Sequence, residues 1–239
     1  MKEATKTRND AYPTRLSGEA NVLERRDPVV YDFQLKTSEI GDEQLHFYDR
    51  NGYLFLESFF TPEEAESYRA ELNRMMETYR GSSEPEVVCE PGSDEVRSVF
   101  AVHAKAGAFR ALADHPRVQE IVKQIVGSDV YVHQSRINFK PGFTGKEFYW
   151  HSDFETWHAE DGMPRMRAVS CSIALEDNTP YNGALMVIPG SHRHFVGCVG
   201  ATPDNHYKQS LRRQEYGIPD RDSLSWLVRQ GGIEMPAGR

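Results

Sequence analysis

The sequence has few cysteines, and none of them is closely paired. Its 239 residues contain 3 Cys, at positions 89, 171 and 198, with no C-x-x-C pair among them. An odd and widely spaced set does not form a disulfide framework, and structural zinc sites use closely spaced ligands. We therefore expect no disulfide and no zinc site, and we expect Cys171, in the apolar run AVSCSIAL, to be a buried and inert thiol.

Long apolar runs and an excess of basic residues are also missing. No stretch approaches the roughly 18 apolar residues of a membrane span, and the N-terminus lacks the apolar segment of a secretory signal. The 28 Lys and Arg against 36 Asp and Glu give a net charge of −8, which disfavours nucleic acid and anionic membranes as partners. These absences predict a soluble, mildly acidic protein of the cytoplasm.

Several common catalytic motifs are absent as well. The chain has no G-x-x-x-x-G-K-[ST], G-x-G-x-x-G, H-E-x-x-H or G-x-S-x-G sequence. Phosphate-binding loops, dinucleotide-binding folds, zinc proteases and the usual serine hydrolase layout therefore lack support.

The first half of the chain reads as helical. Residues 1–30 are polar and irregular and are expected to form an N-terminal arm, and residues 31–239 a single domain. Thr61-Pro62 is a strong helix start, with an N-cap hydroxyl followed by proline at the first helical position. The other expected elements are a short helix at 45–50 that stops at Asn51-Gly52, a strand at 53–60, a loop or lid at 81–98, and helix at 109–126 with Pro116 inside it and Gly127 at its end.

The second half reads as β structure. Strand-like segments are separated by Gly, Pro, Asn or Asp, a spacing that indicates a barrel or sandwich. The fold class expected is thus α+β, with helices first and a β core after them. The expected strands cover residues 129–140, 146–157, 167–177 and 183–191.

The sharpest chemical feature is Trp150-His151-Ser152-Asp153. On a strand, residues i and i+2 point to the same face, so His151 and Asp153 would project together. One imidazole nitrogen and one carboxylate oxygen are two of the three ligands in the facial triad of non-haem Fe(II) oxygenases. The alternative is a surface pair or a structural hydrogen bond.

Polar residues precede this motif at strand alternation. Gln134, Arg136, Asn138 and Lys140 would share one face and line one cavity, although the same pattern also suits the solvent side of a sheet. Lys140 or Arg136 could hold a carboxylate of an anionic cosubstrate. Trp157 could offer its ring to a cationic or delocalised ligand, or it could be a core tryptophan.

The blocks WHSDFETWH and NGALMVIPGSH, inside residues 134–192, resemble the ectoine hydroxylases, a group of phytanoyl-CoA dioxygenase-like Fe(II)/2-oxoglutarate oxygenases. ERRDPVVY and HYKQSLRRQEYGIPD extend the resemblance over nearly the whole chain. It implies a double-stranded β-helix core, jelly-roll or cupin-like, with N-terminal helices packed outside. It also implies hydroxylation of ectoine, a cyclic amidine, to 5-hydroxyectoine, with Fe(II) as cofactor, 2-oxoglutarate and O₂ as cosubstrates, and succinate and CO₂ as co-products.

The resemblance assigns roles residue by residue. His151 and Asp153 match the first two iron ligands, and Lys140 matches a 2-oxoglutarate contact, with Arg136 as a second candidate there. Gln134 and Trp157 match ectoine-contacting positions, and Asn138 is a further substrate-binding candidate on the face of Gln134. The family also leads us to expect a homodimer.

The chain departs from the family pattern at its end. The third iron ligand, a histidine, and an arginine that binds 2-oxoglutarate belong to the last core strands, and the chain stops at GGIEMPAGR before either. The other histidines do not fit the ligand pattern, including those that follow Asp153, which are His158, His192, His194 and His206. We therefore expect a C-terminally truncated form, lacking the last core strands, with poor stability in isolation. Two alternatives stay open: an ectoine-binding protein without catalysis, and a hydroxylase of another small amino-acid derivative.

Overall fold

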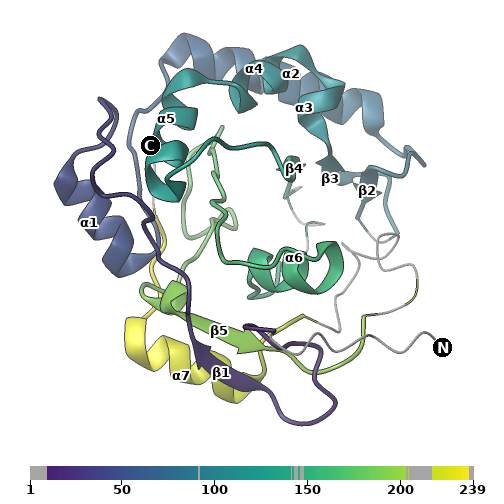
Figure 1. The fold of residues 1–239 in the computed structure, drawn as a ribbon. Helices are drawn as coiled ribbons and strands as arrows, with labels where there is room; N and C mark the ends of the chain where they lie inside the picture. Colours follow the sequence, from purple (N-terminus) through teal and green to yellow (C-terminus); the bar gives the residue numbers. More distant parts are fainter. Residues whose placement is uncertain are drawn as a thin grey trace.

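Helices form an arc around one side of the molecule, and a strand pair with a helix beneath it lies on the opposite side (Figure 1). The computed structural model describes residues 10–90, 92–140, 142, 145, 148–202, 204 and 217–236. His206 and most of HYKQSLRRQEYGIPD lie outside the described residues. The helices are α1 (Asp42–Asn51), α2 (Pro62–Tyr79), α3 (Val102–Lys105), α4 (Gly107–Ala113), α5 (Pro116–Val126), α6 (Asp153–Asp161), the 3₁₀ turn η1 (Ser191–Arg193) and α7 (Arg221–Gly231).

The helix signals in the first half are confirmed. The Thr61 hydroxyl accepts a hydrogen bond from the Glu64 amide, and the Glu64 carboxylate accepts one from the Thr61 amide, so a reciprocal capping box opens α2. Gly127 ends α5 in the left-handed conformation, as expected for a helix C-cap. The predicted helix at 109–126 is divided into α4 and α5 by a turn at Asp114 and His115.

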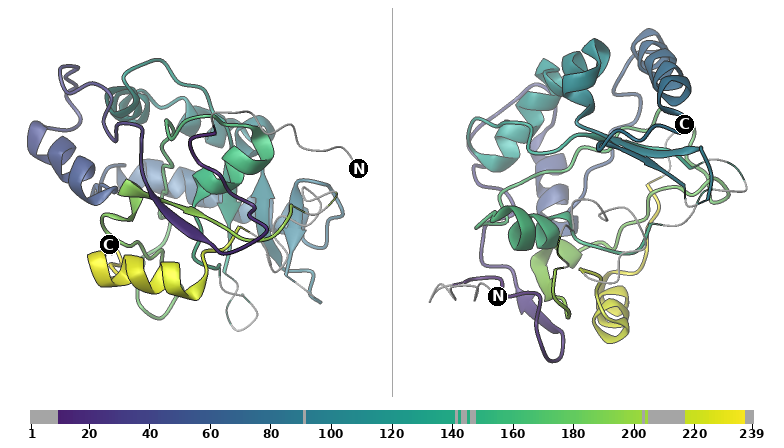
Figure 2. Two further views of the ribbon diagram at one scale, coloured as in Figure 1. Left: turned by 60° about the horizontal axis from the view of Figure 1, so that its bottom comes forward. Right: turned by 90° about the vertical axis from the view of Figure 1, so that its right-hand side faces the viewer.

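Two small antiparallel sheets carry the strands. One pairs β1 with β5, so that Asn21 lies opposite Gly197 and Glu24 opposite His194. The other has the order β2-β3-β4, with Val99 opposite Ile137. Figure 2 shows β1 and β5 running side by side in both of its views. The strand bounds are β1 (Asn21–Glu24), β2 (Val87–Cys89), β3 (Val96–Phe100), β4 (Arg136–Asn138) and β5 (His194–Gly197).

The α+β class is confirmed, but most of the expected strands are wrong. Residues 146 and 147 of the expected segment 146–157 lie outside the described residues. In the described parts of 129–140, 146–157, 167–177 and 183–191, only Arg136–Asn138 forms a strand, and Val187 makes one isolated bridge to Glu234. Residues 53–60 are irregular, and the loop or lid expected at 81–98 is instead the hairpin β2–β3. The physical reason is that apolar alternation shows which faces are buried, whereas a strand also needs a partner for its backbone groups.

The N-terminal arm is part of the packed structure from residue 10 onward. Tyr12 has none of its surface exposed and packs edge-to-face on Phe154, at 5.3 Å between ring centroids. Together with Met166 and Phe195, these rings form a small hydrophobic core of their own. Residues 10–30 thus contact elements from later in the chain, through β1 on β5 and Tyr12 on Phe154.

The exposure of Cys171 and the length of the helices can also be compared with the expectations. Cys171 is exposed, so the prediction of a buried thiol is wrong, although Val169 and Leu175 of the same run pack against hydrophobic clusters. Among the described residues, no helix has the length and apolar character required to cross a bilayer.

Replacing Gly52 by alanine is expected to destabilise the fold strongly. Gly52 ends α1 at φ +80°, and a Cβ at this position would lie 2.2 Å from Nδ1 of His192. A left-handed non-glycine residue and the resulting overpacking together cost roughly 2 to 4 kcal/mol of unfolding free energy. Urea unfolding measures the loss, with Gly18→Ala as the control because nothing lies within 4 Å of a Cβ there. Equal midpoints for the two variants would contradict the expectation.

Candidate metal centre and substrate site

The structure brings His151 and Asp153 together. Nε2 of His151 lies 3.4 Å from Oδ1 of Asp153, and the two side chains are 29% and 31% exposed. The expected strand is wrong, since Asp153 is the first residue of α6. Ser152 nevertheless has extended backbone, at φ −110° and ψ 122°, so residues i and i+2 still project together before the helix begins.

Asp153 is held by three polar side chains. Besides His151, its Oδ2 accepts a hydrogen bond of 2.8 Å from the Ser170 hydroxyl, and an Arg136 Nη2 lies 3.6 Å from its Oδ1. Burial alone would raise the pKa of this carboxyl group, but the hydrogen bond with His151 and the charge of Arg136 outweigh burial and lower the pKa to about 2. The carboxylate is therefore ionised at neutral pH, which is the form that binds metal ions.

The orientation of His151 is set by its other ring nitrogen. Nδ1 lies 2.7 Å from the carbonyl oxygen of Tyr149, a distance at which Nδ1–H donates a hydrogen bond. When Nε2 gives up the proton that bonds Asp153 while Nδ1 keeps its own, Nε2 presents a lone pair, and metal-bound histidines are commonly oriented in this way. The Tyr149 carbonyl thus directs Nε2 toward the space beside Asp153.

These two donors fit a non-haem iron site. Two ligands about 2.1 Å from one ion and at right angles to each other stand about 3 Å apart, close to the 3.4 Å between Nε2 and Oδ1. In the part of the chain that the structure describes, no group of three His, Cys, Asp or Glu side chains could hold a metal ion. The described residues therefore offer two of the three ligands of a facial triad.

The candidate residues for binding 2-oxoglutarate and substrate lie on or next to β4. Ile137 and Phe139 are buried while Asn138 and Lys140 are exposed, so the predicted alternation is confirmed here. Asn138 Oδ1 accepts a hydrogen bond of 2.8 Å from Ser98 on β3. The stem of Lys140 packs on the backbone of Gly183, since a Cβ on Gly183 would lie 2.5 Å from Lys140 Cδ.

Two other candidates are placed differently from the expectation. Gln134 is exposed and precedes β4 rather than lying on it. Arg136 is half-buried and points to Asp153, so its nearest acidic partner is a candidate metal ligand. Lys140 lies elsewhere against an aromatic ring, with its Nζ 5.8 Å from the centroid of Phe148.

Trp157 lies on α6, one turn after Asp153, and not on the expected strand. It is 9% exposed, and the ring of His133 packs against it at 5.1 Å between centroids and an angle of 75°. His133 in turn lies 3.1 Å from the carboxylate of Asp161, at the end of the same helix. Trp157 is therefore a buried residue of α6 that follows Asp153 by one helical turn.

The three described histidines that follow Asp153 in the sequence have other partners. Nε2 of His192 lies 3.0 Å from the carbonyl oxygen of Asp49, and burial lowers the pKa of His192. His158 contacts the Met163 carbonyl and Asp10, and His194 packs edge-on against Trp226 at 4.8 Å. None of the three faces the pair His151 and Asp153.

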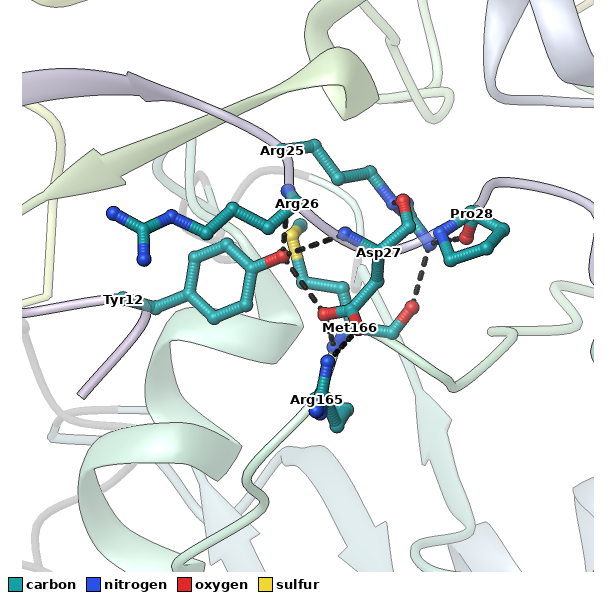
Figure 3. Close-up of polar contacts among 7 residues, drawn as sticks. All are labelled: Tyr12, Arg25, Arg26, Asp27, Pro28, Arg165 and Met166. Atoms are coloured by element: carbon teal, nitrogen blue, oxygen red, sulfur yellow. Dashed lines mark hydrogen bonds and ion pairs between the residues drawn. The ribbon is translucent and has the colours of Figure 1, made fainter. Parts of the chain in front are cut away.

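Sequence reasoning missed the residues that support this site. Ser170 had no signal beyond its place in an apolar run. The start of α6, however, was signalled by Ser152 and Glu155, the S-x-x-E spacing typical of a helix N-terminus. The ERRDPVVY block also has a structural use: the Asp27 carboxylate accepts hydrogen bonds from the Tyr12 hydroxyl and the Met166 amide (Figure 3).

The fold and this site agree with one family of oxygenases. The family model for phytanoyl-CoA dioxygenase (PhyH) matches residues 48–233, a range that includes the candidate metal ligands. The chain belongs to the phytanoyl-CoA dioxygenase family.

Individual relatives of the chain carry a more specific name than that of the family. An ectoine dioxygenase of Stutzerimonas stutzeri (strain A1501) is 52% identical over 229 residues, which are 96% of this chain and 76% of the relative. An ectoine dioxygenase of Halomonas elongata is 48% identical over 242 residues, 100% of this chain and 72% of the relative. The crystal structure of EctD from S. alaskensis with 2-oxoglutarate and 5-hydroxyectoine has a TM-score of 0.85 at 41% identity, covering 97% of this chain and 76% of that one. The structure of the same protein with bound Fe has a TM-score of 0.84.

Proposed function

We propose that this protein is an Fe(II)- and 2-oxoglutarate-dependent dioxygenase that hydroxylates ectoine to 5-hydroxyectoine, with succinate and CO₂ as co-products. The observation that carries the proposal is the approach of His151 Nε2 to Asp153 Oδ1, in a chain that is 52% identical to an ectoine dioxygenase over 229 residues. When bound, the iron with 2-oxoglutarate and O₂ supplies the oxidising power that the side chains of the protein lack.

The chain's own residues bind and orient the reactants. His151 and Asp153 hold the iron, while the Tyr149 carbonyl and the Ser170 hydroxyl orient these two ligands. Lys140 attracts a carboxylate of 2-oxoglutarate, and Arg136 keeps Asp153 ionised next to it. The main role of Arg136 is thus to keep Asp153 ionised, and binding of 2-oxoglutarate is its second role.

Ectoine is assigned to the residues around Trp157. The delocalised amidinium of ectoine suits the face of an aromatic ring, and His133 fixes the orientation of the indole. Gln134 and Asn138, which are both exposed, offer amide groups to the polar edge of the substrate. The third iron ligand is not among these residues, and its identity is left open by this assignment.

Several finer features belong to the same proposal. The jelly-roll core, with residues 31–239 as one domain and residues 1–30 as its arm, is supported by the likeness to EctD. The homodimer rests on the family resemblance alone. A cytoplasmic location and the lack of a nucleic-acid partner are supported by the composition and the net charge of −8.

The direct test is to incubate the 239-residue chain with Fe(II), 2-oxoglutarate, O₂ and ectoine. We expect mass spectrometry to find ectoine with one added oxygen atom, and no such product when 2-oxoglutarate is left out. Proline and other small cyclic amino acids are offered in parallel. Oxygen added to one of these and not to ectoine would overturn the substrate assignment in favour of a related hydroxylase.

The alternative function is that the chain binds ectoine without catalysis. It stands because the described residues contain only two candidate iron ligands. Calorimetry separates the two functions: ectoine binding that is unaffected by metal and 2-oxoglutarate supports a binding protein. Binding of ectoine that strengthens when both are present supports the dioxygenase.

A further inference from the structure

The N-terminal arm lies between β5 and α6, the helix that begins with Asp153. The Thr14 hydroxyl accepts a hydrogen bond of 3.0 Å from the Cys198 amide and donates one of 2.5 Å to Glu155 Oε1. The Leu16 amide donates to the Cys198 carbonyl at 2.9 Å. The arm is thus anchored to the end of β5 on one side and to the first turn of α6 on the other.

A buried charge network joins the arm to both ends of α6. A guanidinium nitrogen of Arg15 lies 3.4 Å from Glu155 and 3.1 Å from Glu160, and the three side chains are 11%, 1% and 7% exposed. Buried carboxylates are costly unless they are paired and hydrogen-bonded. Because Glu155 is in the first turn and Glu160 in the last, Arg15 spans the helix along its length.

The backbone around this network is built to fit it. Arg15 has φ +55°, an uncommon conformation for a residue with a side chain, which persists only where the surroundings hold it. Gly217 closes the network from a third segment of the chain. A Cβ on Gly217 would lie 2.7 Å from Arg15 Nη1 and 2.9 Å from Glu155 Oε2, so a larger residue would force the pair apart.

Rings and a further polar contact extend the same interface. Tyr12 packs on Phe154, the residue that follows Asp153, and Asp10 lies 3.0 Å from Nε2 of His158. The arm therefore contacts α6 at successive positions from its first turn to its last. None of these contacts involves Asp153 itself, whose carboxylate faces His151, Arg136 and Ser170 instead.

We infer that Arg15, through Glu155 and Glu160, is a positioning residue for the metal ligand Asp153. Fixing the axis of α6 fixes the Cα of its first residue, and a ligand held rigidly binds metal more tightly than one that must be ordered on binding. This inference rests on the proposed iron site. It goes further by giving the N-terminal arm, which carries no ligand, a measurable effect on metal affinity.

The test compares Arg15→Ala with Arg15→Lys, and uses Arg117→Ala on α5 as the matched control. Arg117 also bonds a glutamate, Glu39, but it lies on a helix without candidate ligands. Hydrogen exchange of the metal-free protein, followed by mass spectrometry, reports the opening of α6. Calorimetry with Co(II) alone, in place of oxidation-prone Fe(II), reports metal affinity.

We expect Arg15→Ala to speed exchange of the α6 amides while the α5 amides keep their rates. Co(II) affinity should fall by about three- to tenfold, toward the lower end of the loss seen when groups supporting a metal ligand are removed. Arg15→Lys, which keeps the charge, should recover most of the affinity, and Arg117→Ala should bind Co(II) as the unmodified chain does. If Arg15→Ala does not fold, Glu160→Gln is measured instead, because it leaves the pair of Arg15 with Glu155 in place.

The outcomes separate this inference from the proposed function. Unchanged Co(II) affinity in Arg15→Ala, next to clear binding by the unmodified chain, overturns the positioning role alone. Equal losses in Arg15→Ala and Arg117→Ala also overturn it, since they would reflect general destabilisation. Absence of Co(II) binding by the unmodified chain overturns the proposed iron site, and the inference with it.

Discussion

Replacing His151 by alanine is expected to abolish the conversion of ectoine. The variant removes one of the two described donors, and a lone carboxylate does not hold Fe(II) at low concentration. Because His151 is partly exposed and, within the described part of the chain, bonds Asp153 and the Tyr149 carbonyl, the fold should persist. Mass spectrometry of the product and calorimetry with Co(II) should both show loss of signal, while circular dichroism stays unchanged.

The matched control for this prediction is His46→Ala. His46 is an exposed histidine on α1 that stacks on Phe33 and lies on a different element from either candidate ligand. Its substitution should leave product formation and Co(II) binding at the level of the unmodified chain. Turnover by His151→Ala at the rate of His46→Ala would show that the metal assignment is wrong.

Replacing Asp27 by asparagine is expected to lower the free energy of unfolding by about 2 to 4 kcal/mol at neutral pH. The Asp27 side chain is 3% exposed and accepts hydrogen bonds from the Tyr12 hydroxyl, the Met166 amide and Arg165. An amide group presents one acceptor oxygen and turns a donor toward these donors. Urea unfolding measures the loss, and Asp129→Asn, at a carboxylate that is 96% exposed, should barely move the midpoint.

The Asp27→Asn variant also tests how the free energy of unfolding depends on pH. Burial alone would raise the pKa of Asp27, but hydrogen bonds from Met166, Tyr12 and Arg165, together with the charge of Arg165, lower it. A carboxyl group with a lowered pKa in the folded state stabilises the fold above its unfolded pKa of about 3.9, and loses this effect as the pH falls through the folded pKa. The stability difference between the parent and Asp27→Asn should therefore be constant from neutral pH down to about pH 5 and shrink below about pH 4. A difference that grows on acidification would contradict this assignment.

The elements that the sequence predicted well are those with local signals. The start of α2 is set by Thr61 and Glu64, and the end of α5 by Gly127, because capping depends on neighbouring residues only. The strands failed because pairing depends on partners far along the chain, such as Asn21 and Gly197. Local alternation at residues 167–177 carries no information about such a partner.

The candidate site likewise contains residues with local sequence signals and residues that depend on distant partners. His151 and Asp153 could be predicted because their juxtaposition needs only two residues of extended backbone, whether or not a strand follows. The groups that orient them could not, since Ser170 is 17 residues away from Asp153 and Arg15 is joined to Glu160 across 145. Arg136 was predicted as a group for binding 2-oxoglutarate from its side-chain chemistry, and only its position shows that it faces Asp153.

The placement of the arm also governs when the protein can fold during its synthesis. The hydrogen bond from Cys198 to Thr14 joins residues 184 apart, and β1 likewise pairs with the late strand β5. Ribosomes add about 5 to 20 residues per second, so the arm emerges roughly 10 to 40 s before its partner strand exists. Contacts this distant also make the last docking step slow relative to helix formation. The candidate metal ligands therefore leave the ribosome before the arm can dock between β5 and α6. Although the arm is synthesised before β5, it is among the last segments to reach its final position.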